Sequence, residues 1–441
     1  MKSAARVAQD TKEPRIFYGW YIVAVGFLSN VASSFALAST LSIFLKPLTA
    51  ELGVSRGVFS LLRSGEGIIG ACLAPLVGML VDRHGGARLM AVGTTLVGVG
   101  YLFLGHIDTF AQFVLIRLVL VTVGDALMGS SVVNIVIAQW FVRQRGRALA
   151  FSSMGIGFAK VCMPVIGAWL IVTLGWRHTW MVFGLSAIVL GVAPALLFVR
   201  KSPEHMGLQP DGGPAVAVGG QPSGARSKPV LRRSAPIHDD VAWTPREALG
   251  TSAFWLLAIT FGIASIGVTG LNLHIYSYVT DVGYPPVIAG SVMSVIASMQ
   301  LASPLAWGFL TERIDARYAA TLRFIVQGIG LSLAILSGNL ICLYCGFFLY
   351  GIGLGGNMVL PDILWASYFG RRSLGKIRGM GIFISQVLAA VGPPFFGFLF
   401  DITGGYGLSF AIFGIVLMIS AILSLMLRQP RKMDRSDGVL E

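Results

Sequence analysis

Charged side chains are scarce in this chain of 441 residues, at 12% of the total, whereas hydrophobic residues make up 55%. A surface that faces water on all sides needs more charge than this, so a set of soluble domains is excluded. Runs of about 20 apolar residues recur, and in hydrocarbon such runs satisfy their backbone groups only as helices. The alternation over about ten residues that is typical of a membrane barrel is lacking. The composition therefore predicts a polytopic helical membrane protein.

Cysteine is also rare, and all four cysteines lie in predicted spans: Cys72, Cys162, Cys342 and Cys345. Because the last two lie one turn apart in an apolar helix with no strand before it, they are expected to be packing residues and not a redox or zinc motif. The sequence contains no Ser-His-Asp arrangement, metal-ligand spacing or phosphate-binding loop. We therefore expect no enzymatic activity, no metal and no cofactor.

Basic residues outnumber acidic ones, giving a formal net charge of +13, and nucleic-acid binding is one possible reason. Their placement favours the positive-inside rule instead, because most fall in segments that are cytoplasmic if the N-terminus is inside. The predicted outer loops and spans hold only Lys46, Arg56, Arg177, Arg63, Arg117 and Lys160. The sequence predicts an integral membrane protein with both termini cytoplasmic and no nucleic-acid partner. A prokaryotic inner membrane fits best, and a eukaryotic plasma membrane stays open.

A short charged turn between apolar runs occurs twice. Residues 78–88 read Gly-Met-Leu-Val-Asp-Arg-His-Gly-Gly-Ala-Arg, and residues 308–317 repeat the glycine, the acid and both arginines at the same or similar offsets. A second pair of segments, 140–147 and 368–379, repeats at about the same separation of 230 residues. The chain therefore consists of two related halves.

These turns resemble the loop signature of the major facilitator superfamily. Within it the chain is similar to the monocarboxylate porters and their bacterial relatives of the oxalate/formate antiporter type. The matching segments are Tyr18-Gly19-Trp20-Tyr21, Phe44-Leu45-Lys46-Pro47-Leu48, and residues 140–155, 274–284 and 353–379. The resemblance implies an all-α fold of twelve transmembrane helices in two pseudo-symmetric six-helix halves, which transports a solute by alternating access.

The apolar runs predict spans at about 17–45, 56–81, 89–106, 111–139, 146–173, 179–199, 252–279, 285–310, 319–338, 340–367, 377–401 and 406–427. The domains are expected to be a tail (1–16), a bundle (17–199), a linker (200–250), a bundle (251–427) and a tail (428–441). Ala36-Leu-Ala38 is similar to a signal cleavage site, but losing the first span would break the symmetry, so we expect it to be retained. The linker composition predicts little ordered structure, except for a helix start at Thr244 to Glu247.

Ionisable side chains at membrane depth are costly unless they are paired or face a cavity, so they mark candidate sites. They are Arg63, Glu66, Arg117, Asp125, Lys160, His274 and Asp362. None is predicted deep in the third, sixth, ninth or twelfth span, which in the superfamily are outer supports. This distribution predicts a central polar pathway.

Each candidate in the first half has two interpretations. Arg63 and Glu66 lie three residues apart, so they form either a neutralised pair or a site where substrate competes with Glu66 for the arginine. Lys160 has no acid one turn away, so it either pairs with Asp125 or binds an anionic substrate. Arg117 lies within about two turns of the outer surface, which favours snorkelling. Glu66 and Asp125 are the candidates for proton coupling.

Further substrate contacts follow from the resemblance. Lys46 matches the lysine of the family's Phe-Phe-Lys motif, which implies that it first captures a carboxylate; an interfacial lysine is the alternative. His274 and Tyr276 lie near the end of the seventh span, where they bind substrate or a proton, unless the histidine is packed and neutral. Uncharged hydrogen bonds are expected from Asn134, Asn272 and Asn357.

The repeated turn implies a gate by the same resemblance. Asp82 is expected to accept hydrogen bonds at the start of the eleventh span and so to close the inner face in one state. Arg83, Arg88, Glu312 and Arg313 supply the rest of this latch. The alternative is that these arginines only obey the positive-inside rule.

The eighth span departs from the family pattern, because residues 297–308 carry no charge where monocarboxylate porters carry an arginine. Either the anchor lies in the first half or the substrate differs. We expect transport of a small organic anion, a monocarboxylate in the first instance, by proton symport or anion exchange. The alternatives are a drug or metabolite exporter, favouring an apolar cation near Asp125, and a non-transporting sensor that signals through residues 200–250.

Overall fold

The computed structural model describes residues 17–36, 38–141, 144–200, 203–206, 208–209, 211, 243–336, 338–370 and 374–430. The N-terminal tail, most of the predicted linker and most of the C-terminal tail lie outside these residues. The described chain is built from helices, which confirms the predicted all-α fold.

The first half contains α1 (Gly19–Ser33), η1 (Ser34–Ala36), α2 (Ala38–Leu52), α3 (Arg56–His84), α4 (Gly86–Leu104), α5 (Phe110–Ile116), η2 (Arg117–Val121), α6 (Thr122–Met128), α7 (Ser130–Trp140) and α8 (Arg145–Phe198). The short η3 (Pro203–Met206) follows. The second half contains α9 (Pro245–Leu249), α10 (Ser252–Asp281), α11 (Pro286–Thr311), α12 (Ala316–Leu336), α13 (Leu340–Gly356), α14 (Leu360–Phe369), α15 (Leu374–Thr403) and α16 (Gly407–Leu425). The helix start predicted at Thr244 is confirmed, because its side chain and that of Glu247 form a reciprocal cap on α9.

Ten segments of the described chain are long and apolar enough to cross a membrane. The charged α3 is not among them, and α8 counts once although it reverses direction at Gly175, whose φ of +79° is one that glycine adopts readily. When α3 is included and α8 is divided at that glycine, the helices are consistent with the predicted twelve spans.

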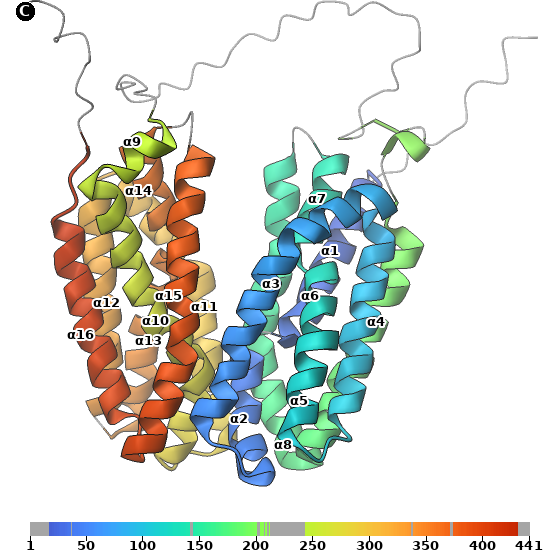
Figure 1. The fold of residues 1–441 in the computed structure, drawn as a ribbon, viewed down its shortest axis with the longest axis horizontal. Helices are drawn as coiled ribbons and strands as arrows, with labels where there is room; N and C mark the ends of the chain where they lie inside the picture. The colour runs from blue at the N-terminus through green and yellow to red at the C-terminus, as the bar shows by residue number, and fades with distance from the viewer. Residues whose placement is uncertain are drawn as a thin grey trace, which may run out of the picture.

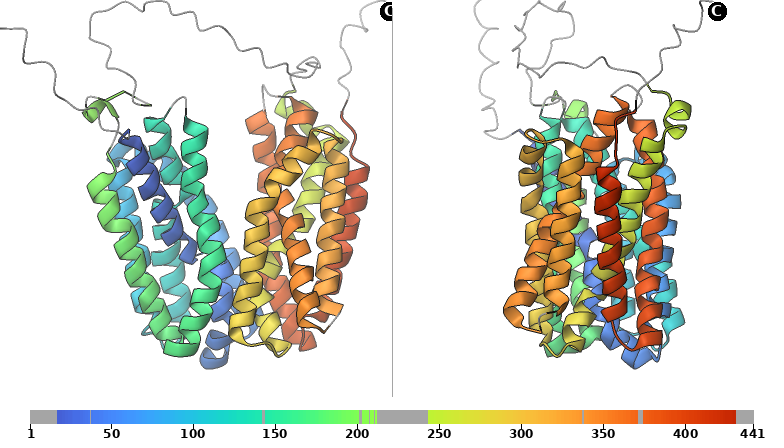
Figure 2. Two further views of the ribbon diagram at one scale, coloured as in Figure 1. Left: turned by 180° about the vertical axis from the view of Figure 1, so that it is seen from behind. Right: turned by 90° about the vertical axis from the view of Figure 1, so that its left-hand side faces the viewer.

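The two halves form separate bundles that converge at one end and diverge at the other (Figures 1 and 2). At the converging end α2 finishes and α3 begins; at the diverging end α1 begins and α16 finishes. Between the bundles, α3 packs against α15, α8 against α11 and α2 against α10. Large apolar side chains such as Leu305, Phe309 and Phe383 are exposed, as expected of helices surrounded by lipid tails.

Two spans are interrupted at equivalent positions of the repeat. The fourth breaks where Gly129 takes an extended conformation (φ −68°, ψ −177°) between α6 and α7. The tenth breaks at residues 357–359, between α13 and α14. A broken helix leaves backbone groups free to contact a solute, so corresponding breaks in two halves are typical of transporter binding sites.

Candidate functional site

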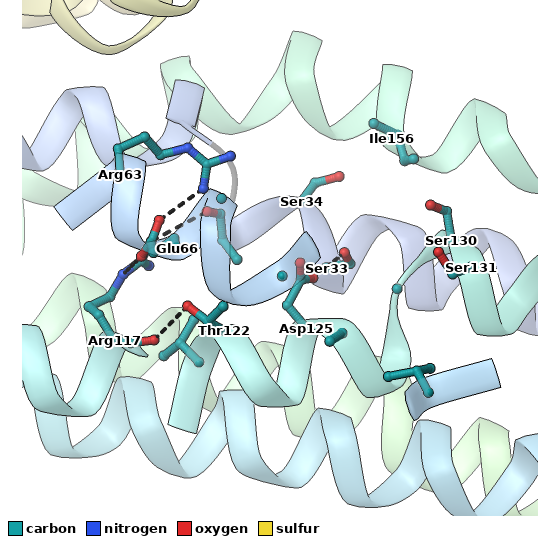
Figure 3. A pocket seen from close by; sticks show the side chains of 17 residues that line it. Ser33, Ser34, Arg63, Glu66, Arg117, Thr122, Asp125, Ser130, Ser131 and Ile156 are labelled. Carbon is teal, nitrogen blue, oxygen red and sulfur yellow. Dashed lines mark hydrogen bonds and ion pairs between the residues drawn. The ribbon is translucent and has the colours of Figure 1, made fainter. Parts of the chain in front are cut away.

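A cavity of about 310 Å³ lies within the first half and is lined by residues of α1, η1, α3, η2, α6, α7 and α8 (Figure 3). Four of the ionisable residues predicted in the first half line it: Arg63, Glu66, Arg117 and Asp125. Its volume suits a small organic molecule.

Glu66, in the lining of this cavity, is held between two arginines. One carboxylate oxygen accepts from Arg63 Nη1 at 2.8 Å, and the other accepts from Arg117 Nε at 2.7 Å and Nη2 at 2.6 Å. The predicted Arg63–Glu66 pair is therefore confirmed, and Arg117 joins it. Because both oxygens are occupied by guanidinium groups, Glu66 acts as a fixed counter-ion for two cations.

The prediction that Arg117 snorkels to the outer surface is wrong. Its side chain is fully buried, its Cζ lies 5.9 Å from the centre of the Trp180 ring, and Nη2 also contacts the carbonyl of Ala36 at 3.4 Å. A charge at that depth needs an anion, and Glu66 supplies it. Arg117 opens η2, a five-residue π-helix, whose wide turn is closed by a 2.9 Å hydrogen bond from the Thr122 hydroxyl to the Arg117 carbonyl. Such turns often occur at functional sites.

Asp125 contacts a neutral partner instead of a cation. Its carboxylate accepts a 2.5 Å hydrogen bond from the hydroxyl of Ser33 on α1. The possible Lys160–Asp125 pair does not form, and Lys160 makes no ion pair or hydrogen bond with any described residue. Lys160 is not among the residues that line the cavity, but Ile156, one turn before it on the same face of α8, is.

The break in the fourth span turns the start of α7 towards the cavity. Gly129, Ser130 and Ser131 all line it, and no side chain caps this helix. The backbone N–H of Val132 donates to the carbonyl of Gly129 at 3.1 Å, so the backbone hydrogen bonds of α7 begin at the break. The first N–H groups of a helix and its dipole favour an anion.

Other predicted substrate residues lie away from this cavity. Lys46 forms a 2.8 Å ion pair with Asp281 at the converging end. His274 is fully buried, and its ring nitrogens contact the hydroxyls of Ser60 at 3.0 Å and Tyr406 at 2.9 Å, which matches the packed histidine of the alternative interpretation. The remaining residues of this group also lie outside the cavity lining: Tyr276, Asn134, Asn272 and Asn357.

The predicted inner latch is not formed between described residues. Arg83, Arg88, Glu312 and Arg313 are exposed and make no ion pair within the described ranges. The side chain of Asp82 lies outside the described residues. At the same diverging end, Asp362 of α14 pairs with Arg378 of α15 at 2.7 Å.

One buried charge contradicts the predicted distribution. The sequence predicts no charge deep in the ninth span, yet the side chain of Arg323 is fully buried on α12, in that span. Its Nε donates to the carbonyl of Gly353 at 3.1 Å, Nη2 donates to the Gln327 amide oxygen at 3.2 Å, and Nη1 has no partner among the described residues. The guanidinium stacks 4.2 Å from the ring of Phe324.

The family model described as "Major Facilitator Superfamily" matches residues 25–383 and 277–440. Monocarboxylate transporter 12-B of Danio rerio is 24% identical over 432 residues, which cover 95% of this chain and 89% of that protein. The uncharacterised MFS-type transporter YhjX of Escherichia coli K12 is 22% identical over 363 residues, covering 80% and 82%.

Solved structures with the same fold are similar over nearly the whole chain. A bacterial homologue of the human lysosomal transporter Spinster superposes with a TM-score of 0.72 at 14% identity, covering 94% of this chain and 97% of that one. A D-xylose–proton symporter gives a TM-score of 0.66 at 12% identity, with 92% and 97% covered. At these identities the likeness concerns the fold.

Proposed function

The chain belongs to the major facilitator superfamily of transporters, and from that premise we propose that it carries a small organic anion, most simply a monocarboxylate. In this proposal residues 17–199 and 251–427 are two rigid units that rock about the cavity, and residues 200–250 link them. The diverging end faces the cytoplasm of a prokaryotic cell. The similarity to monocarboxylate transporters supports the choice of substrate class.

The observation that carries the proposal is the charge around the cavity. Four ionisable residues line the cavity and balance one another, Arg63 and Arg117 against Glu66 and Asp125. Lys160, one turn beyond the cavity-lining Ile156 on α8, adds a fifth charge that has no ion pair among the described residues. One cation is left without an anion, in a region where unpaired charge is costly. A monoanionic substrate neutralises this excess, and an apolar cation increases it.

Lys160 and Arg63 are the proposed anchors, assisted by the start of α7. Lys160 pairs with no acid among the described residues. The Arg63 side chain is 30% exposed, so Arg63 can contact a solute while one of its nitrogens holds Glu66. This arrangement places the anchor in the first half and accounts for an eighth span without charge. Asn357 at the break of the tenth span is a candidate for a neutral contact from the other half.

Proton coupling is assigned to Asp125 before Glu66. Both carboxylate oxygens of Glu66 accept from guanidinium groups, whereas the side-chain partner of Asp125 among the described residues is the Ser33 hydroxyl. Protonating Asp125 would raise the net charge around the cavity from one to two and strengthen anion binding. This is the charge change that a proton–anion symporter requires.

Uptake of labelled lactate, pyruvate and oxalate into proteoliposomes tests the proposal, with and without an inward proton gradient. We expect wild-type uptake, and a loss of at least tenfold in Lys160→Gln because the unpaired cation is removed. The matched control is Lys376→Gln, since Lys376 is an exposed lysine on α15 with no ion pair among the described residues, and it should transport normally.

Each outcome separates the candidates. Gradient-stimulated uptake supports symport, whereas uptake that requires a preloaded anion and ignores pH supports exchange. A folded wild-type protein that moves an apolar cation and no carboxylate would overturn the anion proposal in favour of the exporter. Unchanged uptake by Lys160→Gln would remove Lys160 from the site.

A further inference from the structure

The converging end holds a second cluster of charges, which lies outside the cavity. Asp281, at the end of α10 in the second half, accepts from Lys46 Nζ at 2.8 Å and from Arg56 Nη1 at 2.6 Å. Both cations belong to the first half, on α2 and α3. Two positive groups therefore bind one carboxylate that reaches them from the other bundle.

A second carboxylate reaches the same place on α3. Asp401 of α15 accepts from the backbone N–H of Arg56 at 3.0 Å and from that of Gly57 at 2.8 Å, so it caps the first turn of a 29-residue helix. A Cβ on Gly57 would lie 2.7 Å from the Asp401 carboxylate, and one on Gly397 would lie 2.6 Å from the Arg56 carbonyl. Only glycines at these positions let α15 approach the helix start closely enough.

The Arg56 side chain is fixed on every side. Its exposed fraction is 13%, its Cζ lies 3.8 Å from the centre of the Phe400 ring, and Nη1 also donates to the Tyr406 hydroxyl at 2.8 Å. Such packing holds the guanidinium in one orientation, and charge-assisted bonds of this length are strong and directional. The converging end thus contains a built carboxylate-binding geometry whose donors all come from one half.

We propose that Lys46, Arg56 and the first turn of α3 form a binding site for the carboxylate group of a solute, and that Asp281 and Asp401 occupy this site in the conformation seen here. The inference rests on the proposed function, because it requires the bundles to rock as rigid units. When the converging end opens, both aspartates leave with the second half, whereas Lys46 and Arg56 stay together on the first. An opened converging end therefore presents Lys46, Arg56 and the first N–H groups of α3 together on one half, whereas Phe400 and Tyr406, which orient the guanidinium here, leave with the second half.

This assignment adds Arg56 and the α3 backbone to the single lysine suggested by the sequence, and it gives Asp281 a competitive role. A solute carboxylate that binds here prevents the aspartates from returning until it moves inwards. The site is then emptied by transport and refilled by the protein's own carboxylates.

Chemical rescue tests the site without any transport. Asp281→Ala should lower the melting temperature of the purified protein, and formate should restore at least half of the loss because it replaces the missing carboxylate between Lys46 and Arg56. Sodium chloride at equal ionic strength should not. Arg56→Gln should also melt earlier but gain nothing from formate. Equal effects of formate and chloride on Asp281→Ala would overturn the inference.

Transport kinetics then separate a binding site from a simple latch. A latch predicts that Asp281→Ala and Arg56→Gln, which break the same ion pair, change uptake in the same direction. The proposed site predicts changes in opposite directions. The substrate is whichever of lactate, pyruvate and oxalate the wild-type protein takes up fastest. Its external KM should fall in Asp281→Ala and rise about tenfold in Arg56→Gln. Changes of the same sign would contradict the proposal.

Arg177→Gln is the matched control for both experiments. Arg177 is also an ion-paired arginine at the converging end, but its partner Glu51 belongs to the same half. Its loss should therefore leave external KM unchanged. Wild-type protein that takes up none of the carboxylates would contradict the proposed function, while the formate experiment would still decide whether this site exists.

Discussion

The two halves share one architecture but hold their buried charges differently. In the first half Arg117 is fully buried and meets the carboxylate of Glu66 beside a cavity. In the second half Arg323 is equally buried, and among the described residues it contacts a carbonyl, an amide oxygen and aromatic rings but no carboxylate. A paired charge near a cavity can respond to a solute, whereas a cation enclosed by neutral groups can only pack. The paired buried arginine and the cavity are therefore found in the same copy of the repeat, which is where we propose that the solute binds.

The broken spans differ in the same way. The fourth span breaks at Gly-Ser-Ser, and its second piece starts uncapped in the cavity. The tenth breaks at Asn-Met-Val, and its second piece begins with the fully buried Leu360 followed by Pro361, which has no N–H to offer. The same interruption of a helix thus leaves a helix start that lines the cavity in one half and, in the other half, a helix start with a buried leucine and a proline.

The largest difference between the halves is expected from removing one carboxylate in each. Glu66→Gln leaves Arg63 and the buried Arg117 without their anion, which should cost about 3–5 kcal/mol and abolish uptake. Asp362→Asn breaks a pair whose side chains are 47% and 41% exposed, and it should cost less than about 1 kcal/mol. Thermal unfolding in detergent measures both changes in stability. Equal losses of stability would show that burial does not determine how much each ion pair contributes.

A smaller difference between the halves, in the rate of uptake, is expected from changing the acidic residue of each repeated turn. Asp82→Asn should leave membrane insertion intact and slow uptake at least tenfold, because the gate in the first copy loses its carboxylate. Glu312→Gln, in the second copy, should slow uptake less than twofold. Initial rates at equal amounts of inserted protein provide the measurement, and a wild-type rate for Asp82→Asn would refute the gating role.

The smallest effect is expected from Arg323→Met. This change removes a charge that has no acid and leaves an apolar side chain of similar length, so stability should change by no more than about 1 kcal/mol. Arg117→Met, the matched change in the first half, should destabilise the protein because Glu66 loses its buried partner. If Arg323→Met instead unfolds the protein, the hydrogen bonds from Arg323 to neutral groups contribute more than about 1 kcal/mol to stability.

The lengths of the apolar runs and the positions of the repeated turns were sufficient to predict the helices, because the thickness of the hydrocarbon layer determines how long a membrane-spanning helix must be. The Arg63–Glu66 pair was also predictable, because residues three apart share a helix face. The Arg117–Glu66 pair joins residues 51 apart, and the Arg56–Asp281 pair joins residues 225 apart. Such pairs depend on how helices pack and rotate, which a single sequence does not specify.

Arg323 was misplaced for a different reason. Its position near one end of a predicted span, in a chain whose arginines otherwise cluster in loops, made an interfacial location the simplest prediction. The structure instead begins α12 at Ala316, which carries Arg323 two turns into the helix. The neighbouring Gln327, one turn later on the same face, was the available signal for a buried polar site.

The reversal at Gly175 has a consequence for synthesis and engineering. The fifth and sixth spans are joined by one glycine in a left-handed conformation, and the next residues are held by Arg177, which donates to the carbonyl of Ile107 and pairs with Glu51. With no loop between them, we expect the two spans to enter the bilayer together as a hairpin. We expect an epitope tag or protease site inserted between Gly175 and Arg177 to disturb these Arg177 contacts, although the glycine itself is exposed.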